Sequence, residues 1–254
     1  MKTNIFHTTL VLLALSLGFT ACETDNYDEP EAAITGQVYD HNGLPFQTAV
    51  GQGSMSIKIV EKSYSVSDSS VVVIPQYLNM TQEGGFTNTK LFAGTYEVCP
   101  WQGAFYEQDG DGDAADVVLL KSGKTTTVNF SVTPYLTLEW VKEPYMDSEG
   151  YLNASFKFYR NQKEGYDMPT LNDCSLYISH TQYCGTEADS NYTPNPTKLT
   201  ADMEGQEISM KSKIPIRYAM HYWVRFGARC SDTYQKYNFT TIEEIEVTSA
   251  QLAQ

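Results

Sequence analysis

The sequence predicts an all-β protein built from two β-sandwich domains in tandem, and three observations lead to this prediction. Short runs rich in Val, Ile, Tyr, Phe and Thr, bounded by Gly, Pro, Asn and Asp, recur along the chain, as is typical of strands and turns. No window after the N-terminal segment shows the three-to-four spacing of apolar residues that an amphipathic helix requires. The length of 254 residues exceeds one domain of roughly 100 to 150 residues, so two hydrophobic cores are expected.

The N-terminus has the pattern of an export signal. A weakly basic start is followed by an apolar run at residues 10–19 and by small residues that end at Cys22. The run is too short to cross a bilayer, which takes roughly 20 apolar residues, so we expect residues 1–21 to be removed as a signal peptide. A cysteine directly after such a run resembles a bacterial lipobox, which implies acylation of Cys22 and anchoring to a membrane. A plain secretory signal is the alternative.

Residues 22–32 are acidic and lack apolar periodicity, so we expect them to form a flexible tether. Acidic residues behind the lipidated cysteine resemble the signal that sends Bacteroidetes lipoproteins to the outer face of the outer membrane. An ordinary solvated linker explains the same residues equally well.

The charge balance of the whole chain excludes one class of partner. The sequence has 17 Lys and Arg against 31 Asp and Glu, a net charge of −14. A charge of this sign repels nucleic acid and anionic lipid headgroups, so no nucleic-acid partner is expected.

The first sandwich is expected at residues 33–132. Alternation at Ile34, Gly36 and Val38 predicts its first strand, which leads into a turn. Further strands are expected at residues 55–59 and 71–74, and two more within 84–98 on either side of a turn at Ala93-Gly94. Residues 115–120 and 125–132 are expected to form a hairpin that closes the domain. Within residues 84–98, we expect Gly94 to supply a positive φ at a turn, and Leu91 and Phe92 to close the core.

The second sandwich is expected at residues 133–254. Apolar alternation predicts strands at residues 136–140, with Trp140 facing the core, and at 152–158, 176–178 and 222–228. The last of these resembles the penultimate strand of an immunoglobulin or fibronectin-type sandwich. Its register places Trp223, Arg225 and Arg229 on the outer face, where a guanidinium can stack on the indole or the face can bind a partner.

The motifs of the first domain carry a family resemblance. A strand, an Asp-x-x-Gly turn and the later segments NTKLFAGTY (residues 88–96) and NFSVTPYL (residues 129–136) resemble the transthyretin-like, carboxypeptidase-regulatory-like sandwich. With Cys22 and the acidic tether, they resemble more narrowly an uncharacterised family of two-domain Bacteroidetes outer-membrane lipoproteins. The resemblance implies a role beside glycan-utilisation systems, with a glycan or an outer-membrane uptake complex as partner and no established catalytic residues.

An acidic loop is the one candidate metal site. Alternating aspartates can direct carboxylates at one cation, and the candidates are Asp109, Asp111, Asp113 and Asp116. An EF-hand requires Gly at the sixth and Glu at the twelfth position of the loop, where this chain has Ala114 and Leu120. Calcium is therefore the only cofactor that the sequence suggests, and a solvated turn is the alternative.

Four aromatic residues are candidate platforms for sugar rings. Two lie in a long polar loop, one in a Pro-Trp-Gln-Gly segment and one on the expected outer face: Tyr183, Tyr192, Trp101 and Trp223. Packing of each ring against its own domain is the alternative interpretation.

The four cysteines after Cys22 can form three pairings, and nearness in sequence favours Cys174 with Cys184, leaving Cys99 and Cys230. No zinc-ligand spacing is present.

An enzyme is not expected. None of the four histidines stands beside a Ser or Cys in a nucleophile motif, and no metalloprotease, phosphate-loop or dinucleotide motif occurs. Cys22, the acidic tether, the paired β-domains and the family resemblance together imply a non-catalytic, lipid-anchored outer-membrane protein that assists polysaccharide capture or uptake by a starch-utilisation-type system. The alternative is a structural or adhesion subunit that binds another surface protein through exposed strand edges.

Overall fold

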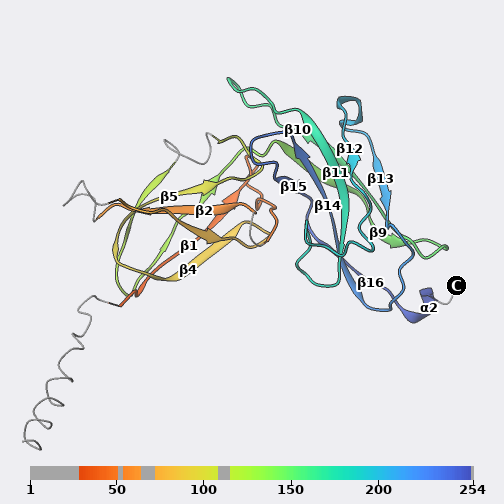
Figure 1. Ribbon diagram of the computed structural model, residues 1–254, viewed down its shortest axis with the longest axis horizontal. Coiled ribbons are helices and arrows are strands. Elements are labelled where there is room, and N and C mark those ends of the chain that lie inside the picture. Colours follow the sequence, from red (N-terminus) through yellow and green to blue (C-terminus); the bar gives the residue numbers. More distant parts are fainter. Residues whose placement is uncertain (1–28, 51–53, 64–71, 108–114, 253–254) are drawn as a thin grey trace, which may run out of the picture. The chain divides into compact units, whose positions relative to one another are not determined.

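The computed structural model describes residues 29–50, 54–63, 72–107 and 115–252 (Figure 1). The predicted signal peptide, Cys22, Asp109, Asp111 and Asp113 lie outside these residues. Within them, no helix has the length and apolar character needed to cross a membrane. Glu31–Gln254 form one compact unit, and the chain is all-β, as predicted.

The first sandwich consists of two sheets that enclose one core. One sheet has the order β4-β1-β7, with β8 also paired to β1; its strands are β1 (Ala32–Tyr39), β4 (Gly85–Leu91), β7 (Thr125–Thr127) and β8 (Phe130–Ser131). The other has the order β3-β2-β5-β6; its strands are β2 (Ser56–Glu61), β3 (Gln76–Asn79), β5 (Gly94–Trp101) and β6 (Asp116–Leu120). The period of two places Ile57 and Ile59 in the core and leaves Lys58 on the outer face.

Four expectations for the first sandwich are wrong. The expected hairpin of residues 115–120 and 125–132 does not form, because β6 pairs with β5 in one sheet and β7 pairs with β1 in the other. Of the strand expected at residues 71–74, the described residues 72–74 are not in a strand, and the strand of this region is β3 instead. Phe92 is 45% exposed, because the turn after β4 directs it outward while Leu91 enters the core. Gly94 does not have a positive φ. A Cβ at Gly94 would lie 2.9 Å from Glu61 Oε1 and from Ser63 Oγ, so these side-chain ends would have to move to accommodate it.

The second sandwich also has two sheets around one core. The first, in the order β13-β10-β9, contains β9 (Leu136–Met146), β10 (Leu152–Arg160) and β13 (Ile208–Lys211). The second has the order β12-β11-β14-β15, with β16 also paired to β14; it contains β11 (Leu171–Ser179), β12 (Thr197–Lys198), β14 (His221–Cys230), β15 (Tyr237–Phe239) and β16 (Glu243–Glu246). A 3-10 turn, η3 (Ala201–Met203), and a short helix, α2 (Ser249–Leu252), complete it. Trp140 packs on Phe226 with a centroid distance of 5.2 Å, which confirms its core-facing register.

The outer face of β14 has the predicted register but different partners. Arg225 stacks on Phe239, with 3.7 Å from its Cζ to the ring centroid, and Arg229 stacks on Tyr237 at 4.8 Å. Neither stacks on Trp223, because β15 lies beside the C-terminal half of β14 and supplies the rings there. Trp223 lies farther along, opposite Ser179.

A short segment after β5 contributes to both cores. Ala104 and Tyr106 belong to the core of the second sandwich, whereas Phe105 between them belongs to the first. The carbonyl of Ala104 accepts hydrogen bonds from the Tyr135 N–H at 3.1 Å and from Asn238 Nδ2 at 2.9 Å. The segment therefore anchors both sandwiches through alternate side chains.

A buried glutamine adds a second link between the sandwiches. Gln82 of the first sandwich donates to the Gln182 carbonyl at 2.7 Å and accepts from the Cys184 N–H at 2.8 Å. Both ends of its amide are thus satisfied by the second sandwich, as a buried amide requires.

The predicted Cys174–Cys184 disulfide is wrong, since both residues are buried thiols. Cys174 lies in the core of the second sandwich, on the inner face of β11. Cys184 packs on the outer face of the same sheet, against Tyr177 and Phe239. The sheet separates the two sulfur atoms. Burial raises the pKa of each thiol to about 12, so both are protonated at neutral pH.

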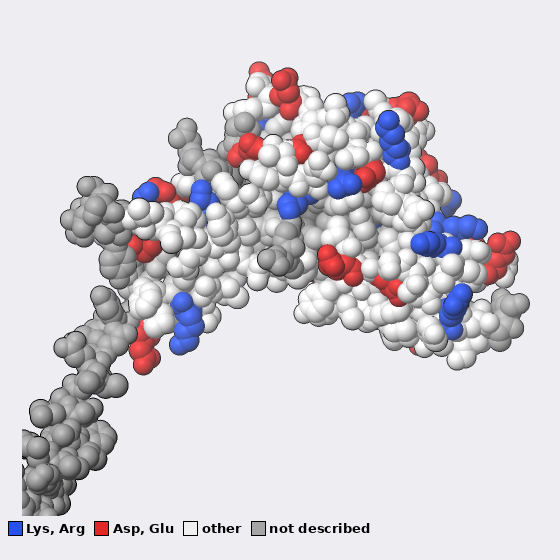
Figure 2. Space-filling view, in the orientation of Figure 1, with Lys and Arg blue, Asp and Glu red and all other residues white. Residues whose placement is uncertain are grey.

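Charged side chains on the face seen in Figure 2 form small mixed groups of both signs, without a large patch of one sign. The net charge of −14 is therefore not concentrated on this face.

Candidate functional site

Two depressions meet at Tyr234, which lines both. The larger has a volume of about 220 Å³ and is lined by residues 48–50 and 54–55 of the first sandwich and by residues of β14, β15 and their connection in the second. The smaller, of about 60 Å³, is lined by residues 100–103 with Phe105 and Glu107. Trp101, predicted as a sugar platform, is therefore part of this site.

The backbone is in an unfavourable conformation at both depressions. Among the described residues, the two non-glycine residues with positive φ are Gln102, at 56°, and Gln235, at 51°. Gln102 lines the smaller depression and Gln235 the larger. This conformation costs about 1 to 3 kcal/mol per residue, and such strain concentrates at binding sites, where shape is maintained against it.

The loop that carries Tyr234 and Gln235 is held by a side chain. Asp232 Oδ2 accepts the N–H groups of Tyr234 at 3.0 Å and Gln235 at 3.2 Å, an Asx-type turn. Burial raises the pKa of the Asp232 carboxyl against the lowering effect of these N–H groups, and the charge of Glu107 adds to the rise. Asp232 thus holds the backbone of the loop that carries Tyr234, which lines both depressions.

Trp101 also belongs to an aromatic group on the outer face of the β3-β2-β5-β6 sheet. It is the last residue of β5 rather than part of a loop, and it is partly exposed. The ring of Tyr77, which is 52% exposed, lies 6.2 Å from that of Trp101, and Lys58 Nζ lies 4.1 Å from the Trp101 ring centroid. Strand pairing produces this group, because Lys58 is opposite Tyr77 on β3 and Ser56 is opposite Trp101 on β5.

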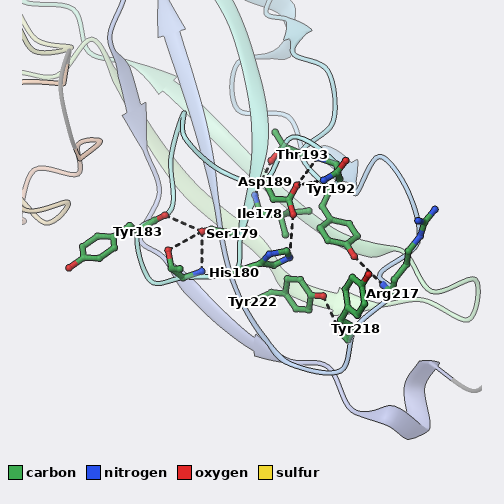
Figure 3. Close-up of polar contacts among 12 residues, drawn as sticks. Ile178, Ser179, His180, Tyr183, Asp189, Tyr192, Thr193, Arg217, Tyr218 and Tyr222 are labelled. Atoms are coloured by element: carbon green, nitrogen blue, oxygen red, sulfur yellow. Dashed lines mark hydrogen bonds and ion pairs between the residues drawn. The ribbon is translucent and has the colours of Figure 1, made fainter.

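Tyr192 is not a sugar platform. It is 3% exposed and lies in the core of the second sandwich. Its ring packs edge to face against Tyr222 and His180, at 5.8 and 5.6 Å (Figure 3). The loop turns inward here because Asp189 accepts the N–H of Asn191 and its carbonyl accepts that of Tyr192, as a tight turn requires.

Tyr183 and Trp223 lie apart from the two depressions, since neither lines them. Tyr183 is 60% exposed and points away from the Tyr192 cluster in Figure 3. Trp223 is partly buried against the outer-face cluster of Tyr177, Cys184 and Phe239. The four predicted platforms thus do not form one surface.

The acidic loop stays a prediction. Asp116 is the exposed first residue of β6, and the other three candidates lie outside the described residues. The described part of the chain contains no group of three His, Cys, Asp or Glu residues placed to hold a metal ion.

Comparison with known proteins agrees with this architecture. Residues 32–133 match the family described as protein of unknown function (DUF3823), N-terminal domain. A DUF3823 family protein from Bacteroides uniformis is 20% identical, with a TM-score of 0.72 over 86% of this chain and 100% of that one. A DUF3823 family protein from Parabacteroides merdae is 19% identical, with a TM-score of 0.67 over 86% and 100%.

A further solved structure, from Bacteroides uniformis, is described as a candidate carbohydrate-binding protein; it is 19% identical, with a TM-score of 0.63 over 86% of this chain and 100% of that one. No curated protein matches the chain. At these identities the solved structures establish the fold alone. Over residues 32–133, which include the strands of the first sandwich, the chain is similar to the DUF3823 N-terminal domain.

Proposed function

We propose that this protein is a non-catalytic, lipid-anchored outer-membrane protein that binds carbohydrate at Trp101, as an accessory to polysaccharide uptake by a starch-utilisation-type system. The observation that carries the binding proposal is the placement of Trp101. Its ring is partly exposed, it has Tyr77 beside it, and it forms one wall of the depression that continues to Tyr234.

The chemistry of these residues suits a sugar. Indole and phenol rings offer large, rigid apolar faces with a polar edge, which match the C–H face and the hydroxyl rim of a pyranose. Gln102 and Gln235 place amide donors and acceptors in the same two depressions, and a few polar groups in an otherwise apolar site orient a ligand.

The lining favours binding over hydrolysis. A glycosidase places two carboxyl groups about 5 to 9.5 Å apart across the bond that it cleaves. Among the described residues that line the two depressions, Glu107 is the single carboxylate. The described lining therefore supplies one of the two acids that this mechanism requires.

The membrane part of the proposal rests on Cys22 and the acidic residues behind it. We expect cells fed radiolabelled palmitate to label the wild-type chain and not a Cys22→Ala chain. Equal labelling of the two chains would contradict lipidation at Cys22.

The binding proposal is tested by retardation of the detergent-purified chain in native gels that contain chemically distinct polysaccharides. We expect at least one neutral or acidic polymer to retard the wild type. Trp101→Ala should weaken that retardation by roughly 30-fold or more, since a tryptophan at the centre of an interface typically contributes about 2 kcal/mol.

Tyr218→Ala is the matched control, because Tyr218 is an exposed aromatic residue that lines neither depression. Its main-chain carbonyl, which accepts from Tyr222 Oη, is kept in the variant. Uniform failure of retardation, or equal retardation of wild type and Trp101→Ala, would overturn the proposal.

A second function, docking onto another surface protein, has one observation in its favour. β6 is an edge strand, and its outward Val117 is 71% exposed, with Leu119 beside it also exposed. Apolar edge strands are templates for pairing with another chain. Recovery of a stoichiometric protein partner from detergent-solubilised membranes, lost on Val117→Lys, would favour this function over glycan binding.

A further inference from the structure

The described lining of the larger depression contains basic side chains and no acidic ones, although the protein as a whole is acidic. Arg229 and Lys236 line the depression, and none of its described lining residues is Asp or Glu. The three residues between Val50 and Ser54 are Gly51, Gln52 and Gly53, so they add no charge wherever they lie. The net charge of −14 for the whole chain makes this local excess of cations unusual.

Arg229 is held in a fixed orientation. Its guanidinium donates to Asp173 from Nε at 3.1 Å and from Nη2 at 2.8 Å, a bidentate pair. The hydroxyl of Tyr237 donates to the same carboxylate at 3.0 Å, and the Tyr237 ring lies under the guanidinium. Asp173 neutralises Arg229 but is not a lining residue.

Lys236 is the uncompensated cation of the lining. It forms no ion pair with any residue that the structure describes. A flexible ammonium group at the wall of a depression, without an anionic partner, is suited to meet the anionic group of a ligand.

A third cation lies directly behind the wall. Arg225 is 0% exposed, and Nη2 donates to the carbonyl of Thr48 at 2.8 Å while its guanidinium packs on Phe239. Thr48 and Phe239 both line the larger depression. Nε and Nη1 of Arg225 have no hydrogen-bond partner among the described residues. Burial lowers the pKa of Arg225 to about 10, which still leaves it charged at neutral pH.

A buried charge with two unsatisfied donors is costly, and native proteins compensate such groups with an ion, a ligand or water. The charge of Glu83 acts on Arg225 from a distance but forms no ion pair with it in the described structure. Arg225 therefore adds a positive potential to the depression that the neighbouring side chains do not cancel.

From these three cations we infer that the larger depression is a subsite for an acidic sugar residue, whose carboxylate or sulfate group lies at Lys236 and Arg229 while the rest of the glycan extends past Tyr234 to Trp101. This inference rests on the proposed carbohydrate binding and specifies the class of ligand. Tyr234 lines both depressions, so one oligosaccharide that passes over its side chain can contact both.

The net negative charge does not oppose this subsite. At physiological ionic strength the screening length is about 8 Å, so a bound sugar interacts mainly with the residues that touch it. Acidic side chains far from the subsite repel a long polyanion more strongly than they repel one bound sugar residue. Short oligosaccharides are therefore the appropriate probes.

The test is isothermal titration of the detergent-purified full chain with trigalacturonic acid and with its trimethyl ester, which has the same rings without charge. Lactose sulfate and lactose form a second pair, which distinguishes a sulfate subsite from a carboxylate subsite. We expect at least one acidic member to bind roughly tenfold more tightly than its neutral counterpart, the scale of one charge-assisted hydrogen bond.

Lys236→Gln should remove most of this preference, measured as the ratio of the affinities for the acidic and the neutral member of a pair. Lys198→Gln, at an exposed lysine of β12, is the matched control and should keep the preference. Arg225→Met, which replaces the buried charge by an apolar chain of similar length, should reduce the preference while the fold is kept. Added NaCl should weaken the preference of the wild type more than that of Lys236→Gln.

Each outcome has a distinct meaning. Equal affinity for both members of each pair, with binding still sensitive to Trp101→Ala, overturns the acidic subsite and leaves carbohydrate binding standing. A preference for acid that survives Lys236→Gln also overturns the subsite. Binding of no sugar in these pairs or in the gel panel overturns the inference and the proposed function together.

Discussion

A Gly36→Ala chain should lose about 3 kcal/mol or more of its free energy of unfolding, since overpacking against a rigid backbone is at the upper end of such effects. Gly36 lies in the middle of β1, opposite Phe86 of β4. A Cβ there would overlap the carbonyl oxygen of Val128 and the ring of Phe86. Neither can move, because Val128 donates to the Thr35 carbonyl and Phe86 fills the core.

Urea unfolding of the purified chain, followed by far-ultraviolet circular dichroism, measures this loss. Gly123→Ala is the control. Gly123 has a φ of 66° and no atom within 4 Å of the added Cβ, so only a backbone penalty of about 1 to 2 kcal/mol is expected. A Gly36→Ala chain no less stable than Gly123→Ala would show that β1 does not pack as closely as described.

Tyr106→Ala should destabilise the second sandwich by about 3 to 5 kcal/mol, the range for large aromatic residues removed from a core. The reason is its position. Tyr106 lies between β5 and β6 of the first sandwich in sequence but packs on Tyr135 at 5.0 Å and donates from its hydroxyl to the Asn161 carbonyl at 2.9 Å. Tyr106→Phe keeps the ring and should cost only about 1 kcal/mol for the hydrogen bond.

Amide hydrogen exchange distinguishes which sandwich is affected. Under native conditions the amides of β10 and β14 should exchange faster in Tyr106→Ala than in the wild type, while the exchange rates of β1 and β2 amides should change less. Faster exchange confined to β1 and β2 would mean that Tyr106 supports the first sandwich, contrary to its packing.

The strands themselves could be predicted because alternation of apolar residues reports burial directly. Ile57 and Ile59 in β2 and Trp140 in β9 face their cores as their spacing predicts. Phe92 could not be placed, because it follows the end of a strand, where the period of two no longer applies. The role of Ala104 and Tyr106 in the second core depends on how two domains meet, which local patterns do not encode.

The candidate site was only partly predictable for the same reason. Trp101 could be predicted as a candidate because it is an aromatic residue among turn-forming residues. Tyr77 and Lys58 lie beside it only because strands β3, β2 and β5 pair. Tyr234 was missed, although Asp232 two residues earlier is a turn signal that could have marked its loop. Cys174 and Cys184 are near in sequence, yet the sheet places them on opposite faces.

The proposed carbohydrate binding depends on contact between Trp101 and the sugar. The sequence has three tryptophans, so Trp140→Phe with Trp223→Phe leaves Trp101 as the only indole emitter. We predict that a glycan that retards the protein in gels shifts the Trp101 emission saturably, with the same affinity as in the titration. Saturable binding of that glycan with unchanged Trp101 emission would contradict the account.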